Sequence, residues 1–326
     1  MKNKLVLTFI FFLFVTYEIT GQSFYCRNYT INDGLPDNTI NTLFKDSRGF
    51  LWIGTDAGAA RFDGNNFNIL YSLDGLAGDK IISITEDKNG YLWFACSDAG
   101  ITRYNGKEIK SFTTHDGLIS NKITTLQYSD KFNLLCIGTE NGLTIFDGTE
   151  FKSYPQNLNF PKQRFHITSF LEGENSILVF TDGNGLYHYI PSNDEFIRMP
   201  VANSLFFSSV FSSFVTQKKD TLISINRNGF KFINQNKTFI NDSLGYITDF
   251  TEDSDHNIWI AANSSFNNTG GLYQFDHDNI HRYNHYLNIE SNNILALEFD
   301  DEENILWIGT KENGLYLYPK NNFCYY

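Results

Sequence analysis

The sequence predicts an all-β, seven-bladed β-propeller built from four-stranded antiparallel blades. Three observations support this prediction. The segment Leu-Trp-Ile-Gly-Thr at 51–55 returns in close form at 92–96, 135–139 and 306–310. The position of its tryptophan recurs every 36–48 residues, and weaker copies give seven positions in all: 52, 93, 136, 179, 223, 259 and 307. Each copy has room for four short strands and none for a crossover helix, which is the signature of a propeller blade.

The elements within one copy follow a fixed order. In the first copy, an Asp-Gly-Leu turn at 33–35 precedes an alternating strand at 39–44, and a polar turn at 46–49 leads into the Leu-Trp strand. A third strand and a fourth strand at 67–71 complete the unit. Strands rich in aromatic and β-branched residues, separated by Gly, Asn and Asp turns, favour antiparallel pairing. The predicted repeats span approximately 29–70, 71–112, 113–154, 155–199, 200–240, 241–283 and 284–326.

Two positions in the repeat are expected to be structural. The large side chain at the tryptophan position should fill the space between neighbouring blades. The small residue two positions later should allow close approach of the strands. The residues to which we assign these roles are Trp52, Gly54, Trp93, Trp259, Trp307 and Gly309.

Both ends of the chain are expected to reach the seventh blade. Residues 23–30 resemble a fourth strand ahead of the first copy, and residues 321–326 resemble the fourth strand of the last copy. Cys26 and Cys324 would then lie close together, and a disulfide between them would be feasible in an oxidising compartment. Cys96 and Cys136 lie in apolar strand patterns that are typical of buried thiols, and no C-x-x-C spacing indicates a metal or redox site.

The first 21 residues have the pattern of a signal peptide. Lys2 and Lys4 precede an apolar run at 5–15, and small residues follow at 20 and 21. The run is too short to cross a bilayer as a helix, which takes about 20 residues, so cleavage near Gly21 is predicted. The alternative is an amphipathic or anchored N-terminal helix. We expect a mature propeller at 22–326 without a membrane span, located in the periplasm or outside the cell.

The charge of the chain argues against two classes of partner. The formal net charge is −12, and only 19% of the residues are charged. Because no basic run reverses this balance locally, phosphate backbones and anionic lipid surfaces should be repelled. We therefore expect neither nucleic-acid binding nor membrane-surface binding.

The repeat motifs resemble a known family. Asp-Gly-Leu-Pro at 33–36, Asp-Ser-Arg-Gly at 46–49, Leu-Trp-Ile-Gly-Thr at 51–55 and Gly58 are similar to the two-component-regulator propeller repeat. The resemblance covers essentially the whole mature chain, strongly in the first three copies and the last. It implies the periplasmic sensor region of hybrid histidine kinases, found especially in Bacteroidetes.

The same resemblance sets expectations about the partner. Such receptors commonly carry two propellers, a β-sandwich, a transmembrane helix and a cytoplasmic kinase. This sequence holds one ring of blades, with no phosphoacceptor-histidine helix and no nucleotide-binding box. The resemblance therefore implies a truncated or stand-alone sensing module that would work with a membrane signalling protein or by self-association.

Several groups of polar residues have structural explanations. Asp33, Asp74 and Asp116 recur with the Asp-Gly-Leu turn, where aspartate bonds its own backbone. The acidic segments 252–255 and 300–303 fall between first and second strands, and we expect solvated hairpin tips there. The histidines at 277, 281 and 285 are four residues apart, which in a strand separates neighbours by roughly 13 Å. No metal and no cofactor is expected.

The best places for a ligand are those where the repeat is broken. One is the long entry to the fourth copy, and the other is an insertion between the second and third strands of the sixth copy. Aromatic, Arg, His and Asn residues in these loops suit stacking on sugars and hydrogen bonding to hydroxyls. The residues assigned to binding a small molecule or oligosaccharide are Arg164, Phe165, His166, Phe266, Asn267 and Asn268. The alternative is that both loops are tolerated variants without a ligand.

Binding without catalysis is the leading functional prediction. The rival is a glycosidase or lyase, and glycoside hydrolysis requires two carboxylates roughly 5 to 9 Å apart. The inner strands supply mainly Thr, Ser and Asn, which disfavours an enzyme, although Asp249, Glu252 and Glu298 keep that alternative open. A protein-interaction platform is a third possibility that the sequence does not separate from sensing.

Overall fold

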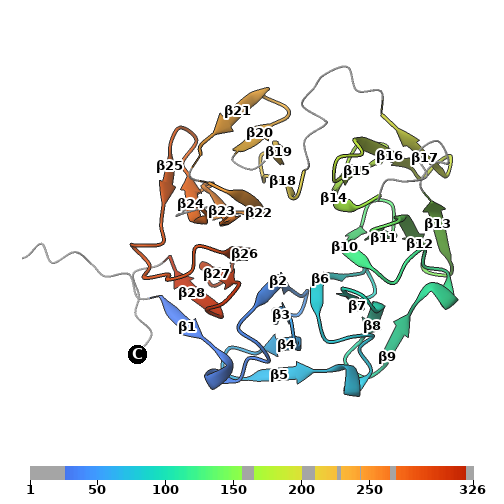
Figure 1. The fold of residues 1–326 in the computed structure, drawn as a ribbon, viewed down its shortest axis with the longest axis horizontal. Helices are drawn as coiled ribbons and strands as arrows, with labels where there is room; N and C mark the ends of the chain where they lie inside the picture. The colour runs from blue at the N-terminus through green and yellow to red at the C-terminus, as the bar shows by residue number, and fades with distance from the viewer. Residues whose placement is uncertain are drawn as a thin grey trace, which may run out of the picture.

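The computed structural model describes residues 26–155, 165–199, 210–225, 229–242, 244–264 and 269–320. These residues form seven four-stranded antiparallel sheets arranged as a ring (Figure 1). The predicted all-β, seven-bladed propeller is therefore confirmed. Among the described residues, no helix has the length and apolar character needed to span a bilayer.

The first strand of each blade lies nearest the ring axis, and the following strands lie progressively further out (Figure 1). The strands, from blade 1 to blade 7, are β2 (Ile40–Lys45), β3 (Leu51–Thr55), β4 (Gly58–Phe62) and β5 (Phe67–Leu70); β6 (Ile81–Glu86), β7 (Leu92–Cys96), β8 (Gly100–Tyr104) and β9 (Ile109–Phe112); β10 (Ile123–Ser129), β11 (Leu134–Thr139), β12 (Gly142–Phe146) and β13 (Phe151–Pro155); β14 (Ile167–Glu172), β15 (Ile177–Thr181), β16 (Leu186–Ile190) and β17 (Glu195–Arg198); β18 (Ser213–Val215), β19 (Thr221–Ile225), β20 (Gly229–Phe232) and β21 (Lys237–Ile240); β22 (Tyr246–Glu252), β23 (Ile258–Asn263), β24 (Gly271–Phe275) and β25 (Ile280–Arg282); and β26 (Ile294–Asp300), β27 (Ile305–Thr310), β28 (Leu315–Pro319) and β1 (Arg27–Tyr29).

Three short 3-10 turns, η1 (Ile31–Asp33), η2 (Ser72–Asp74) and η3 (Thr114–Asp116), connect blades at the Asp-Gly-Leu motifs. In η1, the Asp33 carboxylate accepts a hydrogen bond of 2.8 Å from the Thr30 backbone N–H. Gly34 follows with a φ of 106°, in the left-handed region that glycine adopts without strain. The aspartates of this motif therefore fix their own turns.

The N-terminal strand β1 closes the ring. It pairs with β28 and supplies the outermost strand of blade 7, as expected for residues 23–30. Tyr29 is buried and packs against Phe62 of blade 1 and Trp307 of blade 7, so it joins the last blade to the first. Residues 321–326, with Cys324, lie outside the described residues, so the Cys26–Cys324 disulfide stays a prediction. Burial raises the pKa of the Cys26 thiol to about 12.

The repeated tryptophans pack between consecutive blades. Trp52 packs with Ile81 and Phe94 of blade 2, and Trp93 packs with residues of blade 3. Trp259 and Trp307 occupy the corresponding positions at the two sides of blade 7. These aromatic side chains therefore hold consecutive blades together.

The two weakest copies are aligned wrongly by the sequence pattern. Val179 packs with the core between blades 3 and 4, and Ile223 packs with the core between blades 4 and 5. The tryptophan position, which faces the following blade, is instead filled by Leu178 and Leu222. The error is one residue, and because side chains in a strand alternate between faces, it moves the residue to the opposite side of the blade.

The repeat glycine lies where neighbouring strands approach closely. A Cβ atom on Gly54 would lie 2.5 Å from Thr42 Cγ2 in the same blade and 2.8 Å from Ile81 Cγ2 in the next blade. Gly138 and Gly309 make the same contacts with their own following blades. The glycine thus sets how tightly consecutive blades pack.

We expect Gly54→Ala to lower the free energy of unfolding by about 1–3 kcal/mol, because the added methyl group overpacks the seam between blades 1 and 2. Urea denaturation measures this change. Adding Thr42→Ser removes the nearest methyl group and should recover part of the loss. An additive loss in the double variant would show that the clash is not the cause.

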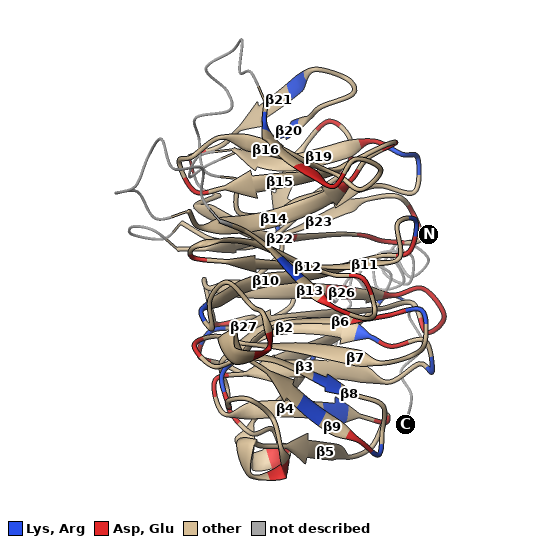
Figure 2. Cartoon of the chain, turned by 90° about the vertical axis from the view of Figure 1, so that its right-hand side faces the viewer, with Lys and Arg blue, Asp and Glu red and all other residues tan. Residues whose placement is uncertain are grey.

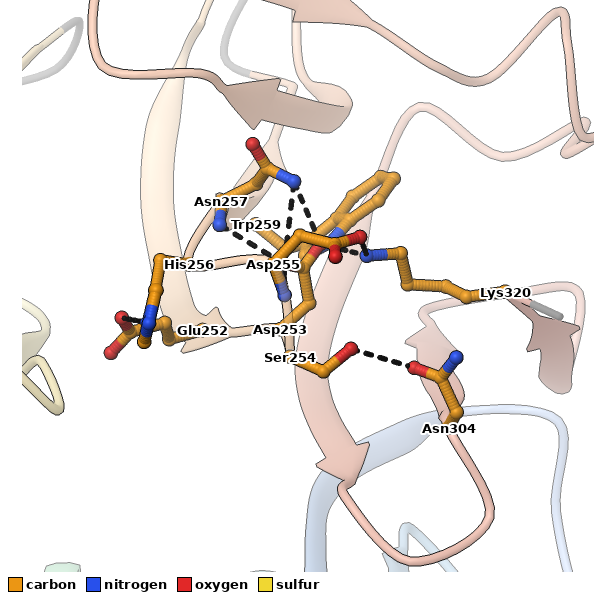
Figure 3. A network of polar contacts seen from close by, with 9 residues as sticks. All are labelled: Glu252, Asp253, Ser254, Asp255, His256, Asn257, Trp259, Asn304 and Lys320. Atoms are coloured by element: carbon orange, nitrogen blue, oxygen red, sulfur yellow. Dashed lines mark hydrogen bonds and ion pairs between the residues drawn. The ribbon is translucent and has the colours of Figure 1, made fainter.

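The turn between the first and second strands carries a repeated Asp–Trp pair. In blade 6, the Asp253 carboxylate accepts a hydrogen bond of 2.7 Å from Trp259 Nε1 (Figure 3). It also accepts hydrogen bonds from backbone N–H groups of its own turn. Lys320 Nζ lies 2.6 Å from the same carboxylate. Asp46 with Trp52 and Asp87 with Trp93 repeat the carboxylate–indole bond, at 2.9 Å in each case.

The expectation of solvated acidic tips is therefore only partly correct. Asp255, Asp301 and Glu302 are exposed, but Glu252, Asp253 and Asp300 are buried. The buried carboxylates accept hydrogen bonds within the turn or from a neighbouring blade, which offsets the cost of removing them from water. The acidic residues of these turns belong largely to the scaffold.

Candidate functional site

A cavity of about 720 Å³ opens where the first strands of blades 7, 1, 2 and 3 end. Its volume lies in the range typical of small-molecule sites. It is lined by the last residues of these strands and by the turns that follow them: residues 44–47, 85–88, 90, 128, 130, 298, 299, 301 and 302. We call it the central cavity.

The wall of the central cavity is predominantly acidic. The lining residues include seven Asp and Glu but only two lysines, Lys45 and Lys88. Lys45 is already paired with Asp300 at 2.7 Å and with Glu302 at 3.0 Å. Burial would lower the pKa of Lys45, but hydrogen bonds to these two carboxylates outweigh it and the pKa is raised. Figure 2 shows that acidic residues occur mainly in the turns at the two rims of the ring, while the strands are mostly uncharged.

Two carboxyl groups on the inner strands have strongly shifted pKa values. Burial raises the pKa of Asp249 to about 7, against the effect of hydrogen bonds from the backbone N–H groups of Leu297 and Phe250. Burial, followed by the negative charge of Asp249, raises the pKa of Glu298 to about 8. Asp300 raises it further, while a hydrogen bond from the Lys45 backbone and the Lys45 charge lower it.

These carboxylates occupy positions at which other blades use hydroxyl groups. Asp249 accepts a hydrogen bond of 2.9 Å from the backbone N–H of Leu297 in the next blade. The Ser83 hydroxyl accepts the equivalent bond, of 3.1 Å, from the backbone N–H of Leu126. Glu298 accepts from the backbone of Lys45 in the next blade. Thr85 makes the corresponding bond with Tyr128, at 3.3 Å. Both carboxylates therefore connect neighbouring blades.

Glu252 has an equivalent scaffold role at the end of its strand. It accepts a hydrogen bond of 2.6 Å from the backbone N–H of Gln217, which lies in a turn of the preceding blade. Glu86 makes the same connection to Ser47 at 2.7 Å, and Glu172 bonds the Ser129 hydroxyl of the blade before it. Asp249, Glu252 and Glu298, the three acidic residues that left an enzymatic function possible from the sequence, thus all connect neighbouring blades.

The raised pKa values predict that stability decreases as pH rises. Above about pH 4, unfolded carboxyl groups are ionised whereas folded Asp249 and Glu298 retain protons, so unfolding releases protons. We expect the free energy of unfolding to fall by several kcal/mol between about pH 5 and pH 9 as these two groups lose their protons. Urea denaturation across this range should show a smaller fall for Asp249→Asn/Glu298→Gln.

Asp98→Asn provides the matched control, since Asp98 is an exposed carboxylate. Its pH dependence should equal that of the unaltered protein. An unchanged slope in the double variant would contradict the assignment of raised pKa values to Asp249 and Glu298.

Of the six residues predicted to bind a ligand, only Phe165 and His166 lie in the described part of the chain. Arg164, Phe266, Asn267 and Asn268 lie outside the described residues. Phe165 is only 1% exposed and packs edge-on against Tyr187 and Phe196, so its ring belongs to the core between blades.

His166 lies next to the beginning of a first strand, not the end. It is partly exposed, and its backbone carbonyl accepts from Asp182 N–H. Because a six-residue strand is about 20 Å long, His166 and the central cavity lie at opposite ends of the inner strands. The sequence signal that was missed is the recurrence of charged residues at the ends of first strands.

The described residues contain no cluster of three or more His, Cys, Asp and Glu side chains arranged to hold a metal ion. His281, one of the three regularly spaced histidines, lies 3.3 Å from Asp276 within its own hairpin. The other two, His277 and His285, have exposed side chains.

Comparison with known proteins places the repeat in a family. Residues 34–57 and 75–98, in blades 1 and 2 with their preceding turns, match the two component regulator propeller family. These two segments are similar to two component regulator propeller repeats. Histidine kinase P4 from Formosa agariphila is 34% identical over 71 residues, which are 21% of this chain and 5% of that kinase.

Solved structures share the propeller fold at low sequence identity. The extracellular domain of the hybrid two component system BT3049 from B. thetaiotaomicron is 20% identical, with a TM-score of 0.74 over 90% of this chain and 42% of that one. The extracellular domain of BT4673, from the same organism and described as a one component system, is 22% identical, with a TM-score of 0.69 over 93% of this chain and 40% of that one.

A third similar structure is PorZ, a surface component of the type-IX secretion system of Porphyromonas gingivalis. It is 15% identical, with a TM-score of 0.68 over 88% of this chain and 47% of that one. The chain thus spans less than half the length of each of these three solved chains.

Proposed function

We propose that this propeller is the ligand-sensing part of an extracytoplasmic signalling receptor, and that a polar small molecule or oligosaccharide binds in the central cavity. The observation that carries the proposal is the cavity itself, which has a ligand-sized volume and is built from four different blades. Its carboxylates accept hydrogen bonds from hydroxyl groups, and Phe44, Tyr128 and Phe299 add aromatic surface. The likeness to extracellular domains of two component systems supports the same role.

Binding is favoured over catalysis by the bonding of the inner carboxylates. Asp249, Glu252 and Glu298 each accept hydrogen bonds that connect blades. A glycosidase needs two carboxyl groups whose environments push their pKa values apart, one as acid and one as base or nucleophile. Here burial raises the pKa of both Asp249 and Glu298. The cavity therefore suits recognition.

The signal would be a change in the packing of blades or in association with a partner. A ligand in the central cavity would touch the turns of four blades at once, and these turns are joined to one another by bonds such as Lys45–Asp300 and Ser47–Glu86. A membrane signalling protein or a second copy of this chain would respond to that change. This proposal also includes secretion through the N-terminal segment.

Calorimetric titration of the mature chain with an oligosaccharide panel tests the binding site. Asp130→Asn/Asp301→Asn removes two exposed carboxylates of the cavity wall that form no ion pair within the described residues. We expect it to weaken binding of any ligand found by about tenfold, the loss of one or two hydrogen bonds to a charged group.

The comparison variant is Arg164→Ala/Phe266→Ala, which alters the two loops that the sequence pattern indicated. It should leave binding unchanged if the ligand occupies the central cavity. The opposite result, with binding lost only in this variant, would place the ligand at those loops and overturn the cavity assignment.

A further inference from the structure

A second cavity lies between blades 5 and 6, away from the central cavity. It has a volume of about 180 Å³, small for a ligand site, so it fits a small molecule only. Its walls come from the turn and outer strands of blade 5 and from two turns of blade 6. We call it the blade 5–6 cavity.

Two histidines of the blade 5–6 cavity occupy glycine positions of the repeat. In the turn after the first strand, Gly49 and Gly90 have φ values of 86° and 77°, and His256 takes this place in blade 6 with a φ of 65°. Each of the three residues donates its backbone N–H to the first aspartate of its turn. Left-handed backbone is strained for histidine but not for glycine.

The second substitution lies in the turn between the third and fourth strands. Gly64, Gly106 and Gly148 have positive φ values in blades 1 to 3, and His277 replaces them in blade 6 with a φ of 77°. The turn itself is unchanged, since Asp276 caps it as Asp63 caps the turn of blade 1. Blade 6 therefore holds two strained histidines, and both line one cavity.

His256 is held in a fixed orientation by a buried carboxylate. Its Nδ1 lies 2.9 Å from Glu252 Oε1, and the Glu252 side chain is only 3% exposed (Figure 3). The other oxygen of Glu252 accepts from Gln217 N–H, so the carboxylate is fully engaged by the protein. Asp220, the second acidic residue of the cavity, accepts from Gln235.

The cations of the cavity have no such partners. Lys218 and Lys237 line the cavity, and within the described ranges neither lies within 4 Å of a carboxylate. In a chain of net charge −12, two lysines without ion pairs beside two histidines form a local excess of hydrogen-bond donors. Such a group favours an anion.

The inner wall of the cavity is apolar. Phe232, Phe275 and Ile258 are buried there, and the rings of Phe239 and Phe275 lie 4.6 Å apart. The His277 ring stands edge-on to Phe275 at 6.2 Å. A ligand at this place would contact hydrocarbon on one side and cationic donors on the other.

We propose that the blade 5–6 cavity binds a small organic anion. A carboxylate or phosphate group would lie between Lys218 and Lys237 with the His277 ring as a further donor, and a ring or short hydrocarbon would cover the phenylalanines. The site is independent of the central cavity and of its ligand.

Calorimetry or ligand-observed NMR on the mature chain tests this site with benzoate and phenyl phosphate as probes and benzyl alcohol as the uncharged comparison. We expect both anions to bind with a Kd on the order of 1 mM and benzyl alcohol to bind at least about tenfold more weakly. Lys218→Gln/Lys237→Gln should weaken both anions about tenfold. Lys107→Gln, an exposed lysine in the corresponding turn of blade 2, should change nothing.

The histidine variants separate a binding role from a structural one. His256→Gly/His277→Gly restores the glycine that blades 1 and 2 use in both turns. Relief of the left-handed backbone offsets the lost bond to Glu252, so the Tm should change little while anion binding weakens. Equal binding of benzyl alcohol, or unchanged anion binding in either the lysine or the histidine variant, would overturn the proposal. Oligosaccharide binding to the central cavity is measured in a separate titration. A negative result for anions in the blade 5–6 cavity would therefore not contradict the proposed sensing function.

Discussion

Trp52→Ala is expected to lower the free energy of unfolding by about 3–5 kcal/mol, as for other buried large-to-small substitutions. The Trp52 side chain is 2% exposed and packs edge-on against Phe94 of the next blade, with ring centroids 5.4 Å apart. Its loss opens a cavity between blades 1 and 2. It also removes the indole donor from Asp46, whose buried carboxylate then lacks one of its partners. Urea denaturation followed by circular dichroism measures the change.

Two further variants make the interpretation specific. Tyr286→Ala removes an aromatic side chain that is 63% exposed, and its effect should stay within about 0.5 kcal/mol. Trp52→Phe keeps most of the packing but loses the hydrogen bond to Asp46. Its loss of unfolding free energy should therefore lie between those of Tyr286→Ala and Trp52→Ala. A loss below about 1 kcal/mol for Trp52→Ala would mean that this position does not carry the packing between blades.

Asp253→Ala is expected to cost about 3–5 kcal/mol, because it breaks a buried charge pair and leaves one partner behind. Burial alone would raise the pKa of Asp253, but hydrogen bonds from Lys320 and Trp259 outweigh it and hold the pKa below its usual value. The stabilisation is therefore present at neutral pH and is lost as the pH falls through that depressed value. Urea denaturation at pH 7 measures it.

Asp255 offers a matched comparison in the same turn. It also pairs with Lys320, at 2.8 Å, but its side chain is 73% exposed (Figure 3). Asp255→Ala should therefore cost less than about 1 kcal/mol. Adding Lys320→Met to Asp253→Ala removes the cation that has lost its buried partner, and it should recover part of the loss. Equal effects of Asp253→Ala and Asp255→Ala would show that burial of the pair is not what matters.

The ring and its blades could be predicted from the sequence because the same motif recurs seven times, and each copy supports the assignment of the others. Seven copies of one motif must form seven equivalent units, and the tryptophan and glycine positions each have one physical role. The prediction was wrong where the motif decays. At Val179 and Ile223, apolar residues occupy several consecutive positions, so the alternation that would fix the register is absent from the sequence.

The candidate site was much less accessible to sequence reasoning. Loops that break the repeat attract notice, whereas the central cavity is made from repeat positions at which ordinary residues gather from four blades. The roles of Glu252 and Asp249 depend on partners 35 and 48 residues away, in neighbouring blades. The two histidines of blade 6 could have been found from the sequence, since aligning the turns places His256 and His277 against glycines.

The closure of the ring by β1 has a consequence for how the chain folds. Arg27 lies opposite Leu317, so the two strands that complete blade 7 are separated by about 290 residues. Blades 1 to 6 are local hairpins that can form one after another, but this pairing carries the loop-closure entropy of almost the entire chain. It must therefore come last, after the sixth blade has brought the two ends within reach. A chain that stalls before that step would expose the edge of β28 and the inner faces of two blades, which is the species that folding factors would have to protect from aggregation.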